Sequence, residues 1–211
     1  MSDKKIIAVT GSTGSQGGGL VRAILADSAR TFAVRAITRK IDSPAARELA
    51  SLGPEVVFGD LDEPGSLERA FADTHGVYAV TNFWEHFSPE RELVQARNIA
   101  RAASNATVRH VVWSTLEDTR ERVPLSDTRM PTLMQRYKVP HFDGKGEADA
   151  LFRALPTTYL RTSFYWDNLI HFGMAPQRGS DGVLQFLLPM GDRKLPGIAA
   201  SDIGACALGG F

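Results

Sequence analysis

Hydrophobic residues along this chain follow two spacings that alternate. Short apolar runs, which are typical of buried strands, occupy residues 6–9, 31–38, 55–58, 76–80 and 108–113. Between them apolar residues recur every three or four positions, as in helices, after residue 19 and over residues 44–52, 64–71 and 89–103. This alternation predicts an α/β fold, a doubly wound Rossmann-type parallel sheet with helices on both faces. Ligands of such sheets bind at the carboxyl ends of the strands.

The second half of the chain is less regular. Residues 117–140 are rich in charge, proline and threonine without a clean period, which indicates a loop. Residues 147–155 have a helical pattern and residues 157–161 an extended one, and the chain is then irregular until a helix begins near residue 201. We expect residues 1–155 to form the Rossmann domain and residues 156–211 to supply the last strand segment and a partial C-terminal lobe.

Composition narrows the class of protein. The 211 residues carry 24 Lys and Arg against 24 Asp and Glu, so no basic field favours nucleic acid. No apolar run approaches the ~18 residues of a membrane helix, and the first strand begins without the apolar core of a signal peptide. The single cysteine, Cys206, cannot form an internal disulfide. We expect a cytoplasmic protein with no nucleic-acid or membrane partner.

The turn after the first strand carries the strongest functional signal. Gly11, Gly14 and Gly17 lie between that strand and a helix, where glycines allow a tight turn and close approach to a pyrophosphate. The helix then points unpaired N–H groups and its positive end at the phosphates. A Walker-type loop is excluded because Leu20, not Lys, follows Gly19. The spacing therefore predicts a dinucleotide site.

The ends of the later strands predict which dinucleotide binds and how. Arg39 and Lys40 follow the second strand, where an acid would select NAD; without that acid, a guanidinium that can pair with a 2′-phosphate favours NADP. Two further strand ends are placed to meet the adenine and the ribose and nicotinamide side, namely Asp60 with Leu61, and Thr81 with Asn82 and Phe83.

Five blocks in order along the chain form a recognisable set. They are GSTGSQGG at 11–18, VTNFWE at 80–85, VWSTLE at 112–117, HFDGKGE at 141–147 and YWDNL at 165–169. Together they resemble the NmrA-like family, an atypical branch of the short-chain dehydrogenases, and most closely its redox sensor proteins. The resemblance implies an NADP-binding Rossmann domain in a family that includes regulators without turnover.

The resemblance also implies which residues contact the cofactor. These are Gly11, Ser12, Thr13, Gly14, Ser15, Gln16, Gly17, Arg39, Asp60, Leu61, Thr81, Asn82, Phe83, Lys145, Phe164, Tyr165 and Asn168. Family members usually continue well past the residues present here, so the substrate-side lobe is expected to be incomplete.

Candidate catalytic residues are few. Short-chain dehydrogenases place a Tyr four residues before a Lys, whose ammonium lowers the phenol pKa for proton exchange. Here the residue four positions before Lys145 is His141. A neutral His141 could donate the proton. In the alternative, His141 caps or packs in the loop and Lys145 serves cofactor binding only. Ser114 or Thr115 supplies the polarising hydroxyl, and Tyr165 is a second candidate acid. The five histidines lack metal-ligand spacing, so we expect no metal site.

Two functions remain open. The first is an NADP(H)-binding sensor or regulator with little turnover that signals to a protein partner, with a homodimer also possible. In it, cofactor would order residues 84–88 and 117–140, of which the longer segment lacks the apolar periodicity needed to anchor it; the alternative is that both are plain surface loops. The alternative is an NADPH-dependent oxidoreductase of a small carbonyl or quinone-like compound.

Overall fold

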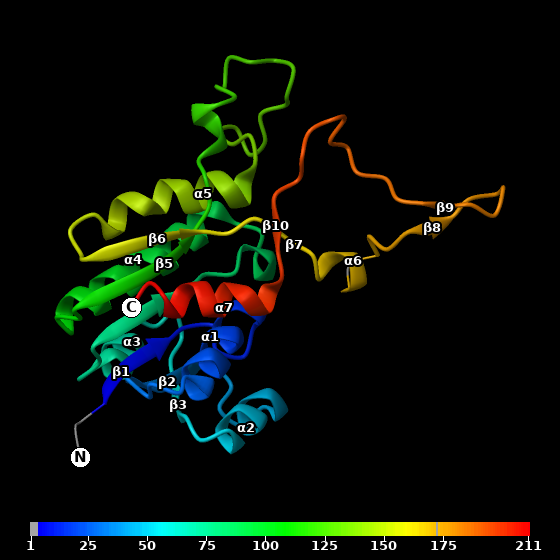
Figure 1. Ribbon diagram of the computed structural model, residues 1–211. Coiled ribbons are helices and arrows are strands. Elements are labelled where there is room, and N and C mark those ends of the chain that lie inside the picture. The colour runs from blue at the N-terminus through cyan, green and yellow to red at the C-terminus, as the bar shows by residue number, and fades with distance from the viewer. Residues whose placement is uncertain (1–3, 172) are drawn as a thin grey trace.

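Six parallel strands form one sheet in the centre of the molecule (Figure 1). The computed structural model describes residues 4–171 and 173–211. In order across the sheet, the strands are β3 (Glu55–Phe58), β2 (Phe32–Thr38), β1 (Lys5–Val9), β4 (Gly76–Ala79), β5 (His110–Thr115) and β6 (Thr157–Arg161). The order reverses between β1 and β4, and open α/β sheets bind ligands at the carboxyl ends of the strands beside such a switch point. The predicted doubly wound α/β fold is confirmed.

Alternate residues of each strand enter two separate cores. Ile7 and Val9 pack with α1 (Ser15–Ala26) and α7 (Ala200–Leu208), whereas Ala8 packs with α3 (Pro64–Phe71) and α4 (Pro89–Asn105). Both faces of the sheet are therefore covered. This explains why the central strands read as continuous apolar runs rather than as alternating ones.

Proline begins four of the helices. It occupies the first helical position of α2 (Pro44–Ser51), α3, α4 and α5 (Pro140–Ala148). There its fixed φ suits the helix and its missing N–H has no helical partner to lose. The expected N-cap Ser88 of α4 is present, because its side chain accepts a hydrogen bond from the Arg91 N–H at 3.2 Å.

The prediction of a helix over 147–155 is wrong in its start. The helix α5 begins at Pro140, ends at Ala148 and continues as a 3-10 turn, η3 (Asp149–Phe152). Residues 140–147 mix glycines with polar side chains and carry no apolar stripe, so periodicity alone does not reveal the helix. The predicted site residue Lys145 therefore lies within a helix, not ahead of one.

The C-terminal quarter of the chain leaves the sheet and returns to it. Beyond β6 come β7 (Phe164–Tyr165), α6 (Asn168–His171), β8 (Gln177–Arg178), β9 (Leu184–Gln185) and β10 (Gly197–Ile198). The β8–β9 hairpin projects away from the body, and β10 pairs with β7 (Figure 1). The chain then returns as α7, whose Gly204 is so close to α1 that a Cβ there would lie 2.2 Å from the Gly19 carbonyl carbon.

Candidate functional site

The turn between β1 and α1 is built by its glycines. Gly11 has a left-handed φ of 59°, and its carbonyl accepts the Gly14 N–H at 2.9 Å. A Cβ on Gly17 would lie 2.4 Å from that same carbonyl oxygen, so only glycine lets α1 approach the turn this closely. The predicted phosphate turn is thus formed, with Thr13, Gly14 and Ser15 exposed.

The amino end of α1 has no side-chain cap. Gly14 at the N-cap makes no side-chain bond and no acidic residue lies in the first turn, whereas Ser43 caps α2 and Ser88 caps α4. Its N–H groups and the positive helix end remain for an anion, and the glycines leave room for one. These residues fit the pyrophosphate of a dinucleotide.

Ser12 uses its side chain inside the protein. The hydroxyl is fully buried and donates to the Ile37 carbonyl of β2 at 2.8 Å. Of the residues predicted to contact the cofactor, Ser12 therefore offers only its backbone, and its side chain fixes the turn against β2.

Arg39 has an acidic partner, Glu85, although the sequence predicted no acid at the end of the second strand. Arg39 follows β2 and forms a bidentate ion pair with Glu85, with Nη1–Oε1 at 2.5 Å and Nη2–Oε2 at 2.8 Å. Glu85 ends the short helix η1 (Phe83–Glu85), which comes after β4. Hydrogen bonding to Glu85 raises the pKa of Arg39. Sequence reasoning missed Glu85 because it is 46 residues from Arg39.

Asp60 and Leu61 lie beside this pair, at the carboxyl end of β3. The Asp60 N–H donates to the Ser66 hydroxyl at 2.9 Å, and the Leu61 carbonyl accepts from the Asn98 amide at 2.8 Å. Both backbones are thereby held in place. The Asp60 carboxylate accepts only the Asp62 N–H, at 2.9 Å, among the described residues.

Lys145 lies buried where β4 and β5 end. Its ammonium donates to the Thr81 hydroxyl at 2.9 Å and to the Ser114 carbonyl at 3.2 Å, and it lies 4.9 Å from the Trp113 ring centroid. Glu92 of α4 completes the group, since its Oε1 is 3.5 Å from the ammonium and accepts from the Thr81 hydroxyl at 2.6 Å. Burial lowers the pKa of Lys145, and the Glu92 charge opposes that shift.

Glu92 was not predicted as a site residue. The sequence signal that could have identified it is a charged residue on the buried, mainly apolar face of α4. Its side chain is fully buried, and Oε2 has no hydrogen-bond partner among the described residues. A buried carboxylate of this kind is retained by its ion pair, so Glu92 and Lys145 hold one another in the interior.

The Gln16 carboxamide connects three hydroxyl groups near the switch point of the sheet. Its Oε1 accepts from the Tyr78 hydroxyl at 2.5 Å and from Ser114 at 2.7 Å, while its Nε2 donates to the Tyr165 hydroxyl. The structure thus brings together three predicted residues, Gln16, Ser114 and Tyr165, and adds Tyr78, which was expected only as a strand residue. Burial raises the pKa of Tyr78 and of Tyr165.

His141 sits among aromatic rings rather than among hydroxyl groups. Its ring centroid is 4.7 Å from that of Trp84, 5.7 Å from Phe83 and 4.9 Å from Phe142. Burial lowers the pKa of His141, which favours the neutral ring. Phe83 is itself buried in this group, so of the predicted residues after β4 only Asn82 is exposed.

Of the predicted residues Phe164, Tyr165 and Asn168, Tyr165 is the one that hydrogen-bonds to another predicted site residue, Gln16. Phe164 shares β7 with Tyr165 and its ring packs 5.9 Å from that of Trp166, and Asn168 begins α6. The hydrogen bond of Tyr165 to Gln16 is what links β7 to the amino end of α1.

The expectation that residues 117–140 lack an anchor is wrong. Asp143 of α5 is fully buried, and its carboxylate accepts from the N–H and hydroxyl of Thr119 and from the N–H groups of Lys138 and Val139. The Lys138 ammonium in turn donates to the Asp127 and Met130 carbonyls. Polar groups, not an apolar stripe, hold both ends of this loop.

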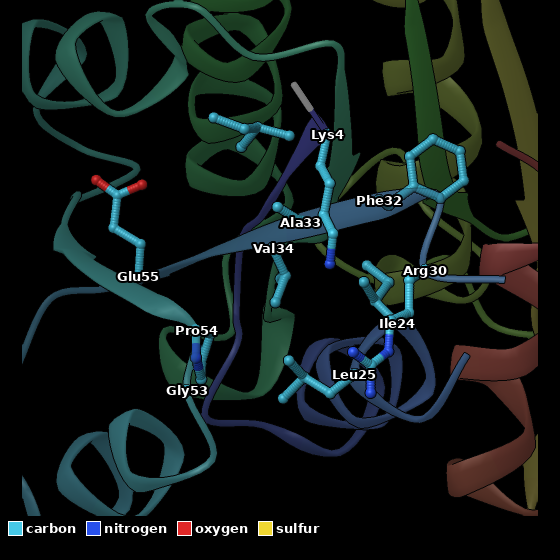
Figure 2. Close-up of a pocket in the computed structure, with 11 residues that line it drawn as sticks. Lys4, Ile24, Leu25, Arg30, Phe32, Ala33, Val34, Gly53, Pro54 and Glu55 are labelled. Atoms are coloured by element: carbon cyan, nitrogen blue, oxygen red, sulfur yellow. The ribbon is translucent and has the colours of Figure 1, made fainter. Parts of the chain in front are cut away.

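A cavity of about 320 Å³ lies at the opposite edge of the sheet. Figure 2 shows it between Ile24 and Leu25 of α1, Phe32 at the start of β2, and Gly53, Pro54 and Glu55, where β3 begins. None of the predicted site residues lines it. The cavity at the amino ends of the strands is therefore separate from the candidate site.

Two other kinds of feature are absent from the described part of the chain. No helix there is both long and apolar enough to cross a bilayer. No three His, Cys, Asp or Glu side chains in residues 4–171 and 173–211 are grouped so that they could hold a metal ion.

Comparison with known proteins identifies the family. Residues 3–209 match the NmrA-like family. The NmrA-like family domain-containing oxidoreductase FrzB of a Cladobotryum species is 31% identical over 212 residues, which cover 93% of this chain and 61% of FrzB. The chain thus spans about three fifths of this curated relative.

Solved structures share the fold. NmrA, described as a negative transcriptional regulator, has a TM-score of 0.79 at 24% identity, covering 98% of this chain and 62% of NmrA. The Citrobacter sp. triphenylmethane reductase complexed with NADP(H) has a TM-score of 0.63 at 26% identity, covering 80% of this chain and 53% of the reductase. With the family match spanning nearly its whole length, the chain belongs to the NmrA-like family.

Proposed function

We propose that this chain binds NADP(H) at the carboxyl ends of β1, β4 and β5, as a cofactor sensor or regulator with little or no turnover. The observation that carries the binding proposal is the uncapped amino end of α1 beside glycines that leave space for a pyrophosphate. The triphenylmethane reductase complex with NADP(H) supports the choice of ligand class.

We assign the remaining parts of the cofactor to the other predicted site residues. Arg39 faces the 2′-phosphate, and Asp60 and Leu61 lie toward the adenine. Lys145 and the segment 81–83 serve the nicotinamide ribose, while Phe164, Tyr165 and Asn168 flank the nicotinamide. A bound nicotinamide would supply the hydride for any reduction.

Low turnover is expected from how the reactive groups are already used. His141 stands where the short-chain dehydrogenases have their Tyr, and it is packed against Trp84. The Ser114 hydroxyl, 1% exposed, donates to Gln16 instead of facing a substrate carbonyl. The Lys145 ammonium already donates to Thr81 and Ser114. We assign Lys145 to binding rather than to proton transfer.

The second candidate is an NADPH-dependent reductase of a small carbonyl or quinone-like compound. Curated relatives such as FrzB carry oxidoreductase names. Within the site, the Tyr165 hydroxyl accepts from Gln16 Nε2, which leaves its own proton for another acceptor. Tyr165 rather than His141 is then the better proton donor.

Titration with NADP, NADPH, NAD and NADH, and then NADPH absorbance with a panel of carbonyls and quinones, separates these candidates. The sensor predicts saturable NADP(H) binding without sustained oxidation. Sustained oxidation that is lost in Tyr165→Phe with binding retained would favour the reductase. A protein partner or homodimer would then be sought by comparing the sedimentation of the free and NADP-bound protein.

A further inference from the structure

The Arg39–Glu85 ion pair joins the ends of β2 and β4, between which the adenosine half of the cofactor would lie. Each guanidinium Nη atom donates to one carboxylate oxygen, Nη1 to Oε1 at 2.5 Å and Nη2 to Oε2 at 2.8 Å. The two side chains are 40% and 38% exposed, so a ligand can reach the pair from solvent. Because solvent competes for both groups, the pair can open when a ligand replaces one partner.

A 2′-phosphate and the Glu85 carboxylate compete for the same guanidinium. The planar fork of Arg matches both groups in two-point hydrogen bonding, and here the Nη1–Nη2 edge is already taken. A phosphate dianion brought to Arg39 also meets the negative charge of Glu85, with Asp60 and Asp62 adding to the field around Arg39. NAD, which has a hydroxyl at this position, meets neither obstacle.

We propose that Glu85 is a specificity-determining residue, a latch that holds Arg39 until a 2′-phosphate displaces it. NAD leaves the latch closed, and NADP opens it. The inference rests on the proposed cofactor site, in which Arg39 faces the 2′-phosphate.

Opening the latch acts on the aromatic segment 83–87. Glu85 is the last residue of η1, so its pair with Arg39 ties this segment to β2. Trp84 and Phe87 are 59% and 58% exposed, and Phe87 has a left-handed φ of 54°, which is strained for a phenylalanine. Release of Glu85 therefore changes the surface that these two rings present. The chain reports the 2′-phosphate itself rather than the redox state of the nicotinamide.

Two ligands without nicotinamide test the latch directly. Adenosine 2′,5′-bisphosphate and 5′-AMP differ only by the 2′-phosphate, so calorimetric titration of both isolates its contribution. Glu85→Gln should raise the affinity for the bisphosphate and for NADP by about fivefold or more and leave 5′-AMP and NAD unchanged. The matched control Glu68→Gln, which removes one acid from α3, should change none of these affinities.

Tryptophan fluorescence reports the movement. In the parent, the bisphosphate but not 5′-AMP should alter the emission, and the change should vanish in Trp84→Phe. If NADP binds and Arg39→Ala weakens it while Glu85→Gln leaves every affinity at the parent value, the latch is refuted and the cofactor site stands. If neither NADP nor NAD binds to the parent, the proposed site fails and the latch with it.

Discussion

At the scale of single residues, the chemistry of this site depends on which partner each polar or charged side chain already has. Arg39 pairs with Glu85, Lys145 with Glu92 and Thr81, and Ser114 with Gln16. Arg39, Lys145 and Ser114 were each predicted from a place at a strand end or in a motif. The partners set what these groups can still bind, and they come from distant parts of the chain.

Arg39→Ala should lower NADP affinity by about 1.5–3 kcal/mol, the range for hydrogen bonds to charged groups, and leave NAD affinity nearly unchanged. Calorimetry with both dinucleotides provides the measurement. Arg39→Lys, which keeps the charge but loses the two-point geometry, should fall between the parent and the alanine variant. An equal loss for NAD and NADP would contradict the assignment of Arg39 to the 2′-phosphate.

His141 should make stability depend on pH. Because burial lowers its folded-state pKa, the unfolded chain binds a proton that the folded chain does not, between that lowered pKa and the ordinary value of 6.5. The free energy of unfolding should therefore fall as pH drops through this window. His141→Phe, which keeps an aromatic ring beside Trp84, should give a shallower dependence in urea unfolding from pH 7.5 to 5. Identical slopes would argue against a buried neutral His141.

At the scale of elements, short contacts decide which substitutions the cofactor turn tolerates. Gly14 is exposed and its Cβ would be 3.3 Å from the Gly11 carbonyl oxygen, whereas the Cβ of Gly17 would be at 2.4 Å from it. The two glycines therefore serve different purposes, space for a ligand and closeness of helix to turn.

Gly14→Val should fold and yet lose dinucleotide binding by more than about tenfold, since a branched side chain fills the space that the pyrophosphate needs. Gly17→Ala should instead lower the free energy of unfolding by about 1–3 kcal/mol through overpacking. Denaturant unfolding and NADP titration of both variants check this. Unchanged NADP affinity in Gly14→Val would place the phosphate site elsewhere.

Asp143→Asn should release the loop 117–140. An amide has one accepting oxygen in place of two, so either the N–H and hydroxyl of Thr119 or the N–H groups of Lys138 and Val139 lose their acceptor, at a cost of about 1–3 kcal/mol. Hydrogen exchange should become faster in 119–139 and stay slow in β1 and β4. The parent should show little change in 117–140 on adding NADP, because Asp143 already holds that loop.

At the scale of the whole molecule, the last helix supports the first. In α7, Gly204 packs against Gly19 of α1, so this helix positions the one whose amino end faces the proposed phosphates. Residues 156–211 are therefore not independent of the cofactor site, since they contribute β6 to the sheet and α7 to its α1 face.

Gly204→Val should reduce the free energy of unfolding by about 2 kcal/mol or more and weaken NADP binding, because a side chain there overlaps the Gly19 backbone and pushes α1 away. Gly209→Ala is the control, since its nearest neighbour would be 3.6 Å from the new Cβ. Thermal unfolding and calorimetry measure both effects. Parent-like binding in a destabilised Gly204→Val protein would separate α7 from the cofactor site.

Local sequence patterns were enough to predict most of the elements and the edge of the sheet that holds the site. Apolar runs at 6–9 and 55–58 and the proline-led helices reflect local periodicity and capping, which need no distant partner. The resemblance of five short blocks predicted the family. By contrast, α5 was placed too late, because its stability comes from buried contacts of Asp143 and Lys145 rather than from an apolar stripe.

The partners of the site residues depend instead on the tertiary structure. Glu85 lies 46 positions from Arg39, and Ser114 lies 98 positions from Gln16. No local pattern encodes such pairs, because parallel strands bring together ends that the intervening helices separate in sequence. The acid at Arg39 and the carboxylate beside Lys145 both arise in this way, from the packing of the sheet with its helices and not from any one segment.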